Sequence, residues 1–323
     1  MKIITLTLSC AFDLHLYCEE LLLGRENFVG ISSRIAGGKG VNCSRALNAL
    51  GVENTAVALL GTEQASEFLQ SIEADGVSAV AVITEGRIRE NITVHPKKGK
   101  ETRISIGSGR AGTQAMGQIR ERLLELFEDG CTVAMMGSVP EGIELSELKK
   151  LLKELKARGA RIVIDSRSFG VADLAEVGAY LIKPNEEELA RYTSAQINGV
   201  DSAIAAARML HGLGIENVLV TLGEAGAVLV NSEGVTVAEA PRIKALSTIG
   251  AGDSTIAGYL AGVYGGLSHE ECLGLAVATG SAACLTEGTA PPRKEDVERL
   301  RSEVLLKQSE VLLIQSEVRA VRE

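Results

Sequence analysis

Several common kinds of site are missing from this sequence. The six cysteines include no Cys-x-x-Cys pair, and neither they nor the four histidines show the spacing of a metal site. We therefore expect free thiols in a reducing compartment rather than disulfides or a metal centre. The Gly-x-Ser-x-Gly elbow of serine hydrolases is also missing.

The chain also lacks a long apolar run. No stretch reaches the length of a membrane-spanning helix, and Met1–Thr5 lacks a signal-peptide cleavage pattern and predicts a strand. We expect a cytoplasmic protein with no membrane partner. The formal net charge of −9 disfavours nucleic acid as a partner, although a few local cations would still bind an anionic substrate.

What the chain does contain is an alternation that predicts an α/β fold. Short β-branched runs alternate with amphipathic helical stretches, as in a doubly wound, mostly parallel sheet with helices on both faces. The predicted strands are Ile3–Leu8, Asn54–Leu60, Cys131–Met136, Arg161–Ile164, Tyr180–Ile182 and Val218–Thr221. The predicted helices are Val41–Leu50, Gln64–Asp75, Thr113–Glu128, Glu144–Arg158, Glu186–Thr193 and Ser202–Leu213.

Polar and small residues gather where these predicted strands end. Ligands of such sheets bind beyond the carboxyl ends of the strands. The residues at or just past a strand end are Asp13, Gly137, Ser138, Asp165, Lys183, Asn185 and Thr221. We expect these residues to line one site.

The segment Ser247–Ser254, with the sequence Ser-Thr-Ile-Gly-Ala-Gly-Asp-Ser, carries the strongest chemical signal. It opens an apolar run from Thr255 to Val263 that predicts a helix, and the N–H groups at a helix N-terminus bind anions. Asp253 at the same place can take a proton from a hydroxyl. An anion site beside a general base is what phosphoryl transfer to an alcohol requires. On this segment alone, simple helix capping by Asp253 is equally open.

A second glycine motif, Gly37–Asn42, precedes another predicted helix. Glycines such as Gly38 let the backbone approach a ligand closely, Lys39 supplies a charge and Asn42 an amide. The motif has neither the spacing of a P-loop nor that of a dinucleotide fingerprint. By itself it is a weak signal.

Together these motifs resemble the ribokinase-like, or phosphofructokinase-B, family of sugar kinases. The resemblance runs from Lys2 to about Arg293, and within the family it is strongest to 1-phosphofructokinase and tagatose-6-phosphate kinase. Six segments fall in the family's order and spacing: Thr5–Leu8, Ala11–Asp13, Gly37–Gly40, Lys183–Glu188, Thr221–Gly223 and Gly250–Asp253.

The resemblance implies one kinase domain over residues 1–293. Segments of about 14–36 and 88–107 would form a small β-sheet lid over the sugar and contact a second copy in a homodimer. From the residues alone, the alternation around Ile92 and Ile104 also fits an ordinary surface hairpin.

The resemblance also implies roles in sugar binding and catalysis. Asp253 would be the general base, and the N–H groups of Gly250, Ala251 and Gly252 would neutralise the transferring phosphoryl group. Asp13 would accept hydrogen bonds from sugar hydroxyls. The implied site for the substrate's own phosphate comprises Gly38, Lys39, Asn42, Arg89 and Ser138, with Arg87 on the same face of the lid strand.

For the nucleotide, the resemblance implies ATP and Mg²⁺. Glu188 would hold the metal through water, one helical turn from Asn185. The implied nucleotide-binding residues are Lys183, Asn185, Thr221, Gly223 and Gly226. Because the sequence has no tryptophan, we expect aliphatic side chains to sandwich the adenine.

These implications favour phosphorylation of a ketohexose monophosphate, with fructose 1-phosphate as the first choice. Tagatose 6-phosphate, an unphosphorylated sugar or nucleoside, and a non-catalytic sugar-phosphate sensor are the alternatives. Lys39 and Arg89 argue against a neutral substrate, and Asp253 against a sensor. Ser9 and Cys10 replace the Asn-Pro usual in this branch, which leaves the identity of the sugar open.

The C-terminal residues 294–323 lie outside the resemblance. Ser302, Ser309 and Ser316 each begin a similar heptad, and valines recur at one heptad position. This period predicts a long helix, packed either on its own domain or on another subunit.

Overall fold

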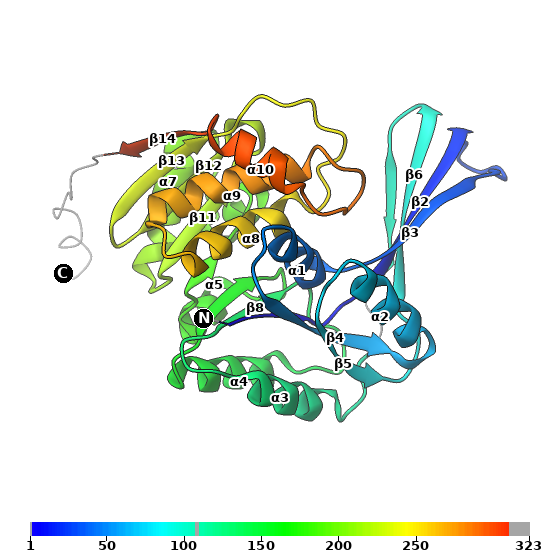
Figure 1. Cartoon of the computed structure of the whole chain (residues 1–323), viewed down its shortest axis with the longest axis horizontal. Helices are drawn as coiled ribbons and strands as arrows, with labels where there is room; N and C mark the ends of the chain where they lie inside the picture. Colours follow the sequence, from blue (N-terminus) through cyan, green and yellow to red (C-terminus); the bar gives the residue numbers. More distant parts are fainter. Residues whose placement is uncertain (1, 107–109, 310–323) are drawn as a thin grey trace.

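The structure, a computed structural model, describes residues 2–106 and 110–309, which form two sheets of unequal size (Figure 1). In the larger sheet, the seven strands from β11 to β5 pair in parallel and the other three are antiparallel. Its order is β14 (Leu305–Ser309), β13 (Gly234–Glu239), β12 (Ala227–Asn231), β11 (Asn217–Thr221), β10 (Leu181–Ile182), β9 (Arg161–Asp165), β8 (Thr132–Met136), β1 (Ile3–Thr7), β4 (Asn54–Gly61) and β5 (Ala79–Thr84).

Helices cover both faces of this sheet. One apolar core lies under α3 (Ala115–Leu126), α4 (Leu145–Ala157), α5 (Val171–Val177), α6 (Glu186–Thr193) and α7 (Val200–Gly212). A second core lies under α1 (Lys39–Ala49), α8 (Ala251–Tyr264) and α9 (His269–Ala283), and α10 (Lys294–Arg301) packs on α9. The strands between them are buried on both sides because helices cover both faces.

The smaller sheet, which we call the lid, has four strands in the order β3 (Gly30–Gly37), β2 (Ala11–Glu20), β6 (Arg89–Lys98) and β7 (Thr102–Ser105). Figure 1 shows it projecting from the main body, beside α2 (Ala65–Ala74). The chain enters the lid directly from β1 and returns through β3 into α1. The lid is therefore anchored at the carboxyl end of a central strand.

The predicted fold class, a doubly wound α/β sheet with a small β lid, is confirmed. Each of the strands and helices predicted between Ile3 and Leu213 is present, with ends within a few residues of those expected. Within the described ranges, no helix is long and apolar enough to cross a membrane.

The prediction of one helix over 294–323 is right for Lys294–Arg301 and wrong for Leu305–Ser309. Helix α10 ends at Arg301, and Leu305–Ser309 forms the edge strand β14 beside β13. The free edge of β13 offers unpaired backbone groups, and a strand there satisfies them while Leu306 packs against Gly274 of α9. The heptad pattern of the sequence gives no information on the free edge of β13, with which these residues pair. The later heptads, at 310–323, lie outside the described residues.

Candidate active site

The N-terminus of α8 is the centre of the site. Gly250 precedes the helix in a left-handed conformation, with φ of +79°, which glycine adopts readily. Asp253 lies in the first turn and is buried. The turn therefore combines the N–H donors of a helix N-terminus with a carboxylate, as the sequence predicted.

Helix α1 meets α8 at this carboxylate. Asn42 donates a hydrogen bond from Nδ2 to Asp253 Oδ2 over 2.9 Å. The approach depends on Gly38 before α1, whose φ is +137° and where an added Cβ would lie 2.8 Å from the Thr7 side chain. The two glycine motifs, about 210 residues apart in the sequence, thus meet in the fold and form one site around Asp253.

The environment of Asp253 raises its pKa to about 7. Burial is the largest cause, and the nearby Asp165 adds to it, whereas Lys39, the Asn42 hydrogen bond and Lys183 act in the opposite direction. A carboxylate with a pKa near neutrality is a better proton acceptor than an ordinary aspartate. Asp253 is therefore suited to take a proton from a hydroxyl.

Two lysines lie beside this carboxylate. Lys39 Nζ is 3.0 Å from Asp165 Oδ2, an ion pair that ties α1 to the end of β9. Lys183, just past β10, is buried and reaches the first turn of α8, where a Cβ on Gly252 would lie 3.0 Å from its Nζ. An ammonium group and a helix N-terminus both attract anions, so the space between Lys183 and α8 favours a negatively charged ligand.

The lid contributes Asp13, which lies inside β2 rather than in a loop after the first strand. Its Oδ1 accepts a hydrogen bond from Asn91 Nδ2 over 2.9 Å and lies 3.5 Å from Arg103 Nη2. An added Cβ on Gly37 would lie 2.8 Å from the other carboxylate oxygen, so glycine is needed there. Asp13 is thereby held beside the Gly37–Asn42 turn.

Arg103 was not identified from the sequence. Arg103 of β7 pairs with Thr93 of β6. Thr93 is two residues from Asn91, so Arg103 and Asn91 lie on the same face of the lid. The alternation along the lid hairpin carried this signal, but only the paired register shows that Arg103 reaches Asp13.

Arg89 lies at a second place, a cavity of about 250 Å³ at the base of the lid. Its Nη atoms donate to the carbonyls of Ile106 and Ser9, and its Nε is buried without a partner among the described residues. Arg87 and Arg110 also line this cavity, and Arg110 was not identified from the sequence. Lys39, the other cation expected to bind the substrate phosphate, does not line this cavity and is paired with Asp165. Ser138 is not among the residues that line the cavity.

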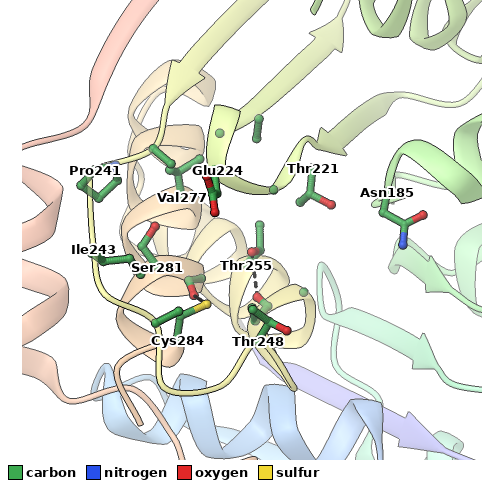
Figure 2. Close-up of a pocket in the computed structure, with 18 of the residues that line it drawn as sticks. Asn185, Thr221, Glu224, Pro241, Ile243, Thr248, Thr255, Val277, Ser281 and Cys284 are labelled. Carbon is green, nitrogen blue, oxygen red and sulfur yellow. Dashed lines mark hydrogen bonds between the residues drawn. The ribbon is translucent and has the colours of Figure 1, made fainter. Parts of the chain in front are cut away.

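A larger cavity, of about 930 Å³, opens on the other side of the α8 N-terminus (Figure 2). Four residues predicted to bind nucleotide line it, namely Asn185, Thr221, Gly223 and Gly226. Ala251 and Gly252 line it as well, and its far wall is largely apolar, with Pro241, Ile243 and Val277. This wall agrees with the expected aliphatic environment for a base.

Glu188 forms a reciprocal cap with Asn185 at the start of α6. Asn185 Oδ1 accepts from the Glu188 N–H over 2.8 Å, and Glu188 Oε2 accepts from the Asn185 N–H over 3.2 Å. The other carboxylate oxygen lies 3.2 Å from Arg167 Nε. Across residues 2–106 and 110–309, no three His, Cys, Asp or Glu side chains form a cluster that could hold a metal. Both oxygens of Glu188 thus accept a hydrogen bond, and each keeps a further lone pair for a water molecule or a cation.

The raised pKa of Asp253 predicts a specific dependence of stability on pH. Because the folded protein holds this proton up to about pH 7 and the unfolded chain releases it near pH 3.8, stability falls as pH rises between these values. Asp253→Asn removes the ionisation and should raise the free energy of unfolding at pH 8 by about 1 kcal/mol or more. The gain should shrink toward pH 4.

Thermal unfolding of both proteins between pH 4 and pH 8 measures this effect. Asp129→Asn, in an exposed turn, is the matched control and should show no such gain at pH 8. If Asp253→Asn is no more stable than the parent protein at pH 8, burial does not disfavour the ionised form of Asp253, and the prediction is wrong.

Comparison with known proteins identifies the family. Residues 6–296 match the model of the pfkB family of carbohydrate kinases. The chain is 30% identical to the 1-phosphofructokinase of Haemophilus influenzae over 283 residues, covering 87% of this chain and 90% of that protein. It is 29% identical to ATP-dependent 6-phosphofructokinase isozyme 2 of Escherichia coli over 267 residues, covering 82% and 86% of the two chains.

A solved structure shows the same architecture. The crystal structure of phosphofructokinase-2 from Escherichia coli in complex with substrates and products superposes with a TM-score of 0.87 at 28% identity, covering 94% of this chain and 99% of that one. The chain belongs to the pfkB family of carbohydrate kinases and is an ATP-dependent enzyme that transfers a phosphoryl group to a sugar.

Proposed function

We propose that this enzyme phosphorylates a ketohexose monophosphate, converting fructose 1-phosphate to fructose 1,6-bisphosphate, with Asp253 as the general base. The observation that carries this proposal is the position of Asp253. Its carboxylate is buried, has a pKa of about 7 and accepts a hydrogen bond from Asn42, and it follows Ala251 and Gly252 on the wall of the 930 Å³ cavity. A base so placed can face both a nucleotide and a sugar hydroxyl.

In the proposed reaction, Asp253 takes the proton of the attacking hydroxyl while the hydroxyl oxygen bonds to the γ-phosphorus of ATP. The bond from that phosphorus to the bridging oxygen breaks, and ADP leaves with the electron pair. Asn42 orients the carboxylate of Asp253. Lys183 and the N–H groups of Gly250, Ala251 and Gly252 would stabilise the charge on the transferring group.

The 250 Å³ cavity supports a substrate that already carries a phosphate. Three arginines line it, Arg87, Arg89 and Arg110, with one acidic residue, Glu85. The Arg87 guanidinium also pairs with Glu63, over 3.4 Å. Arginine binds phosphate in a bidentate manner, so a cavity of this composition suits a phosphoryl group. The similarity to the 1-phosphofructokinase of Haemophilus influenzae favours fructose 1-phosphate.

The second candidate is a ketohexose 6-phosphate. The similarity to 6-phosphofructokinase isozyme 2 of Escherichia coli favours fructose 6-phosphate, and tagatose 6-phosphate belongs to the same class. Arg103, 3.5 Å from Asp13, could serve either kind of substrate because it lies on the lid face that carries Asp13 and Asn91.

We also propose that the enzyme uses ATP together with Mg²⁺. Glu188 would contact the hydrated metal through water, since its oxygens already accept hydrogen bonds from Asn185 and Arg167. Glu186 and Glu187, which line the larger cavity, would face the same water shell. The metal would supply positive charge that offsets the charge of the phosphates.

A coupled ADP-release assay tests the substrate. The panel comprises fructose 1-phosphate, fructose 6-phosphate, tagatose 6-phosphate, fructose and ribose, each with ATP and with either Mg²⁺ or a chelator. We expect turnover of phosphorylated ketoses only, lost with the chelator. Arg89→Ala should raise the KM of the sugar phosphate roughly tenfold or more, because a charge-assisted contact is removed. Arg122→Ala, on the exposed face of α3, is the control. Turnover confined to the neutral sugars would refute the proposal.

The pH profile tests the role of Asp253. We expect kcat/KM to fall below about pH 7, where Asp253 becomes protonated. Asp165→Asn removes a charge that raises this pKa and frees Lys39 to face Asp253, so the acid limb should move to lower pH. Asp129→Asn should leave the limb in place. The substrate phosphate is the same in every profile, so an unmoved limb in Asp165→Asn would contradict the assignment.

We further propose that the enzyme is a homodimer through the lid. Exposed apolar residues gather on the lid strands and on the connection between β2 and β3. They are Tyr17, Leu22, Leu23, Phe28, Val29, Ile31 and Ile104. Exposed apolar side chains in this number favour a protein contact, and a second lid offers the same residues.

Sedimentation of single variants tests the dimer. Wild-type protein should have twice the mass of the chain, and Ile31→Asp should be monomeric because a charge would be buried in the contact. Leu213→Asp, at a comparably exposed leucine near the end of α7, should remain dimeric. A monomeric wild-type protein would rule out the proposed contact.

A further inference from the structure

Three carboxylates line the larger cavity among the described residues, and Glu224 lies apart from the other two. Glu186 and Glu187 are at the start of α6, next to Asn185. Glu224 is in the short 3-10 turn η2 (Gly223–Ala225) between β11 and β12. Figure 2 shows its side chain within the cavity, with Thr221 and Thr255 to one side and Pro241 and Ile243 to the other.

The two ends of this cavity differ in character. At one end lie Thr248, Ala251 and Gly252, at the N-terminus of α8, where an anion is favoured. The opposite wall presents Pro241, Ile243 and Val277. A nucleoside triphosphate has the same division, since its phosphates are anionic and its base has two apolar faces. The match sets the phosphates at α8 and the base against the apolar wall.

Glu224 lies between these ends, and a carboxylate accepts hydrogen bonds but donates none. Phosphate oxygens offer no donor to it and repel its charge. The part of a nucleotide that lies between phosphates and base is the ribose, whose two adjacent hydroxyls are both donors. No ion pair or hydrogen bond to another described residue occupies Glu224, so its oxygens are available.

We propose that Glu224 binds the ribose hydroxyls of the nucleotide and selects ribonucleotides over deoxyribonucleotides. This inference rests on the proposed placement of ATP in the larger cavity. It assigns Glu224 a role in recognition and none in phosphoryl transfer.

The backbone holds Glu224 at this place. Gly223 and Gly226, on either side of it, have φ of +55° and +105°, in the left-handed region that glycine adopts without strain. A Cβ on Gly226 would collide with the Ala238 carbonyl of β13. The turn is therefore packed closely against β13, and this packing holds Glu224 at the cavity wall.

Nucleotide binding without turnover tests the inference. Isothermal titration with ADP, 2′-deoxy-ADP, 3′-deoxy-ADP and IDP gives four dissociation constants for each protein. Wild-type enzyme should bind at least one deoxy analogue roughly tenfold more weakly than ADP, which is the effect of losing a hydrogen bond to a charged group. In Glu224→Ala, ADP should weaken to the level of the deoxy analogue, so the discrimination disappears. Glu224→Gln, which keeps one acceptor oxygen, should lie between.

Glu186→Ala is the matched control, because it removes a carboxylate from the phosphate end of the same cavity. It should keep the full discrimination between ADP and the deoxy analogues, whatever its effect on affinity. IDP differs from ADP only in the base, so its ratio to ADP should be the same in wild type and Glu224→Ala.

Each outcome decides the matter. Equal affinities for ADP and both deoxy analogues in the wild type would overturn the inference, as would a Glu224→Ala variant that still discriminates. A change confined to the IDP ratio would assign Glu224 to the base instead and overturn the ribose assignment. Absence of any adenine nucleotide binding would refute the proposed function itself, which is a distinguishable result.

Discussion

The balance of charge around one buried carboxylate is the constraint on which the site depends. Asp253 is held out of solvent by the packing of α8 against α1, and burial alone would keep it neutral. Lys39 and Lys183 favour its ionised form, and Asp165 opposes it. Because burial and Asp165 outweigh the two lysines, the pKa of Asp253 rises to about 7, and the proton can leave or return near neutral pH.

The same balance explains why Lys39 is not a free cation for substrate. Its ammonium group is paired with Asp165. Arg87, Arg89 and Arg110 line the 250 Å³ cavity, and Lys39 does not. The Gly37–Asn42 motif alone does not reveal this difference in placement.

Local sequence was sufficient to predict most of the main sheet and its helices, because each parallel strand is a short buried run followed by an amphipathic helix. Local sequence was also sufficient to predict that Asp253 lies in the first turn of a helix, since a glycine turn before a helix is a local feature. Asn42 was predicted as a ligand-binding amide, but its hydrogen bond to Asp253 joins motifs about 210 residues apart and appears only in the fold.

The lid and the C-terminus depend on pairing between strands, and here the sequence was less informative. Arg103 reaches Asp13 because β2 pairs with β6 and β6 with β7, a register that no single segment encodes. Leu305–Ser309 is a strand because β13 has a free edge, not because of its own heptad period. The sequence of the turn at Gly223–Ala225 does not show which of its side chains lines the cavity, so Glu224 could not be singled out from it.

Ser9 and Cys10, which replace the Asn-Pro usual in this branch, lie at the wall of the 250 Å³ cavity. The Ser9 carbonyl accepts from Arg89, and both residues line the 250 Å³ cavity. Burial raises the pKa of the Cys10 thiol to about 12, so this position presents a neutral, compact group. The substitution therefore alters the cavity wall next to Arg89.

The route of the chain through the lid has a consequence for how such an enzyme can diversify. Residues 11–37 leave the main body at the end of β1 and return at the start of α1, so Asp13 and Asn42 lie near the two ends of one segment. Pairing of Ala11 with Gly37 joins these two ends. Insertions or deletions between them would change the outer part of the lid while the two ends keep their spacing. The outer part of the lid and the residues near Asp253 can therefore evolve at different rates.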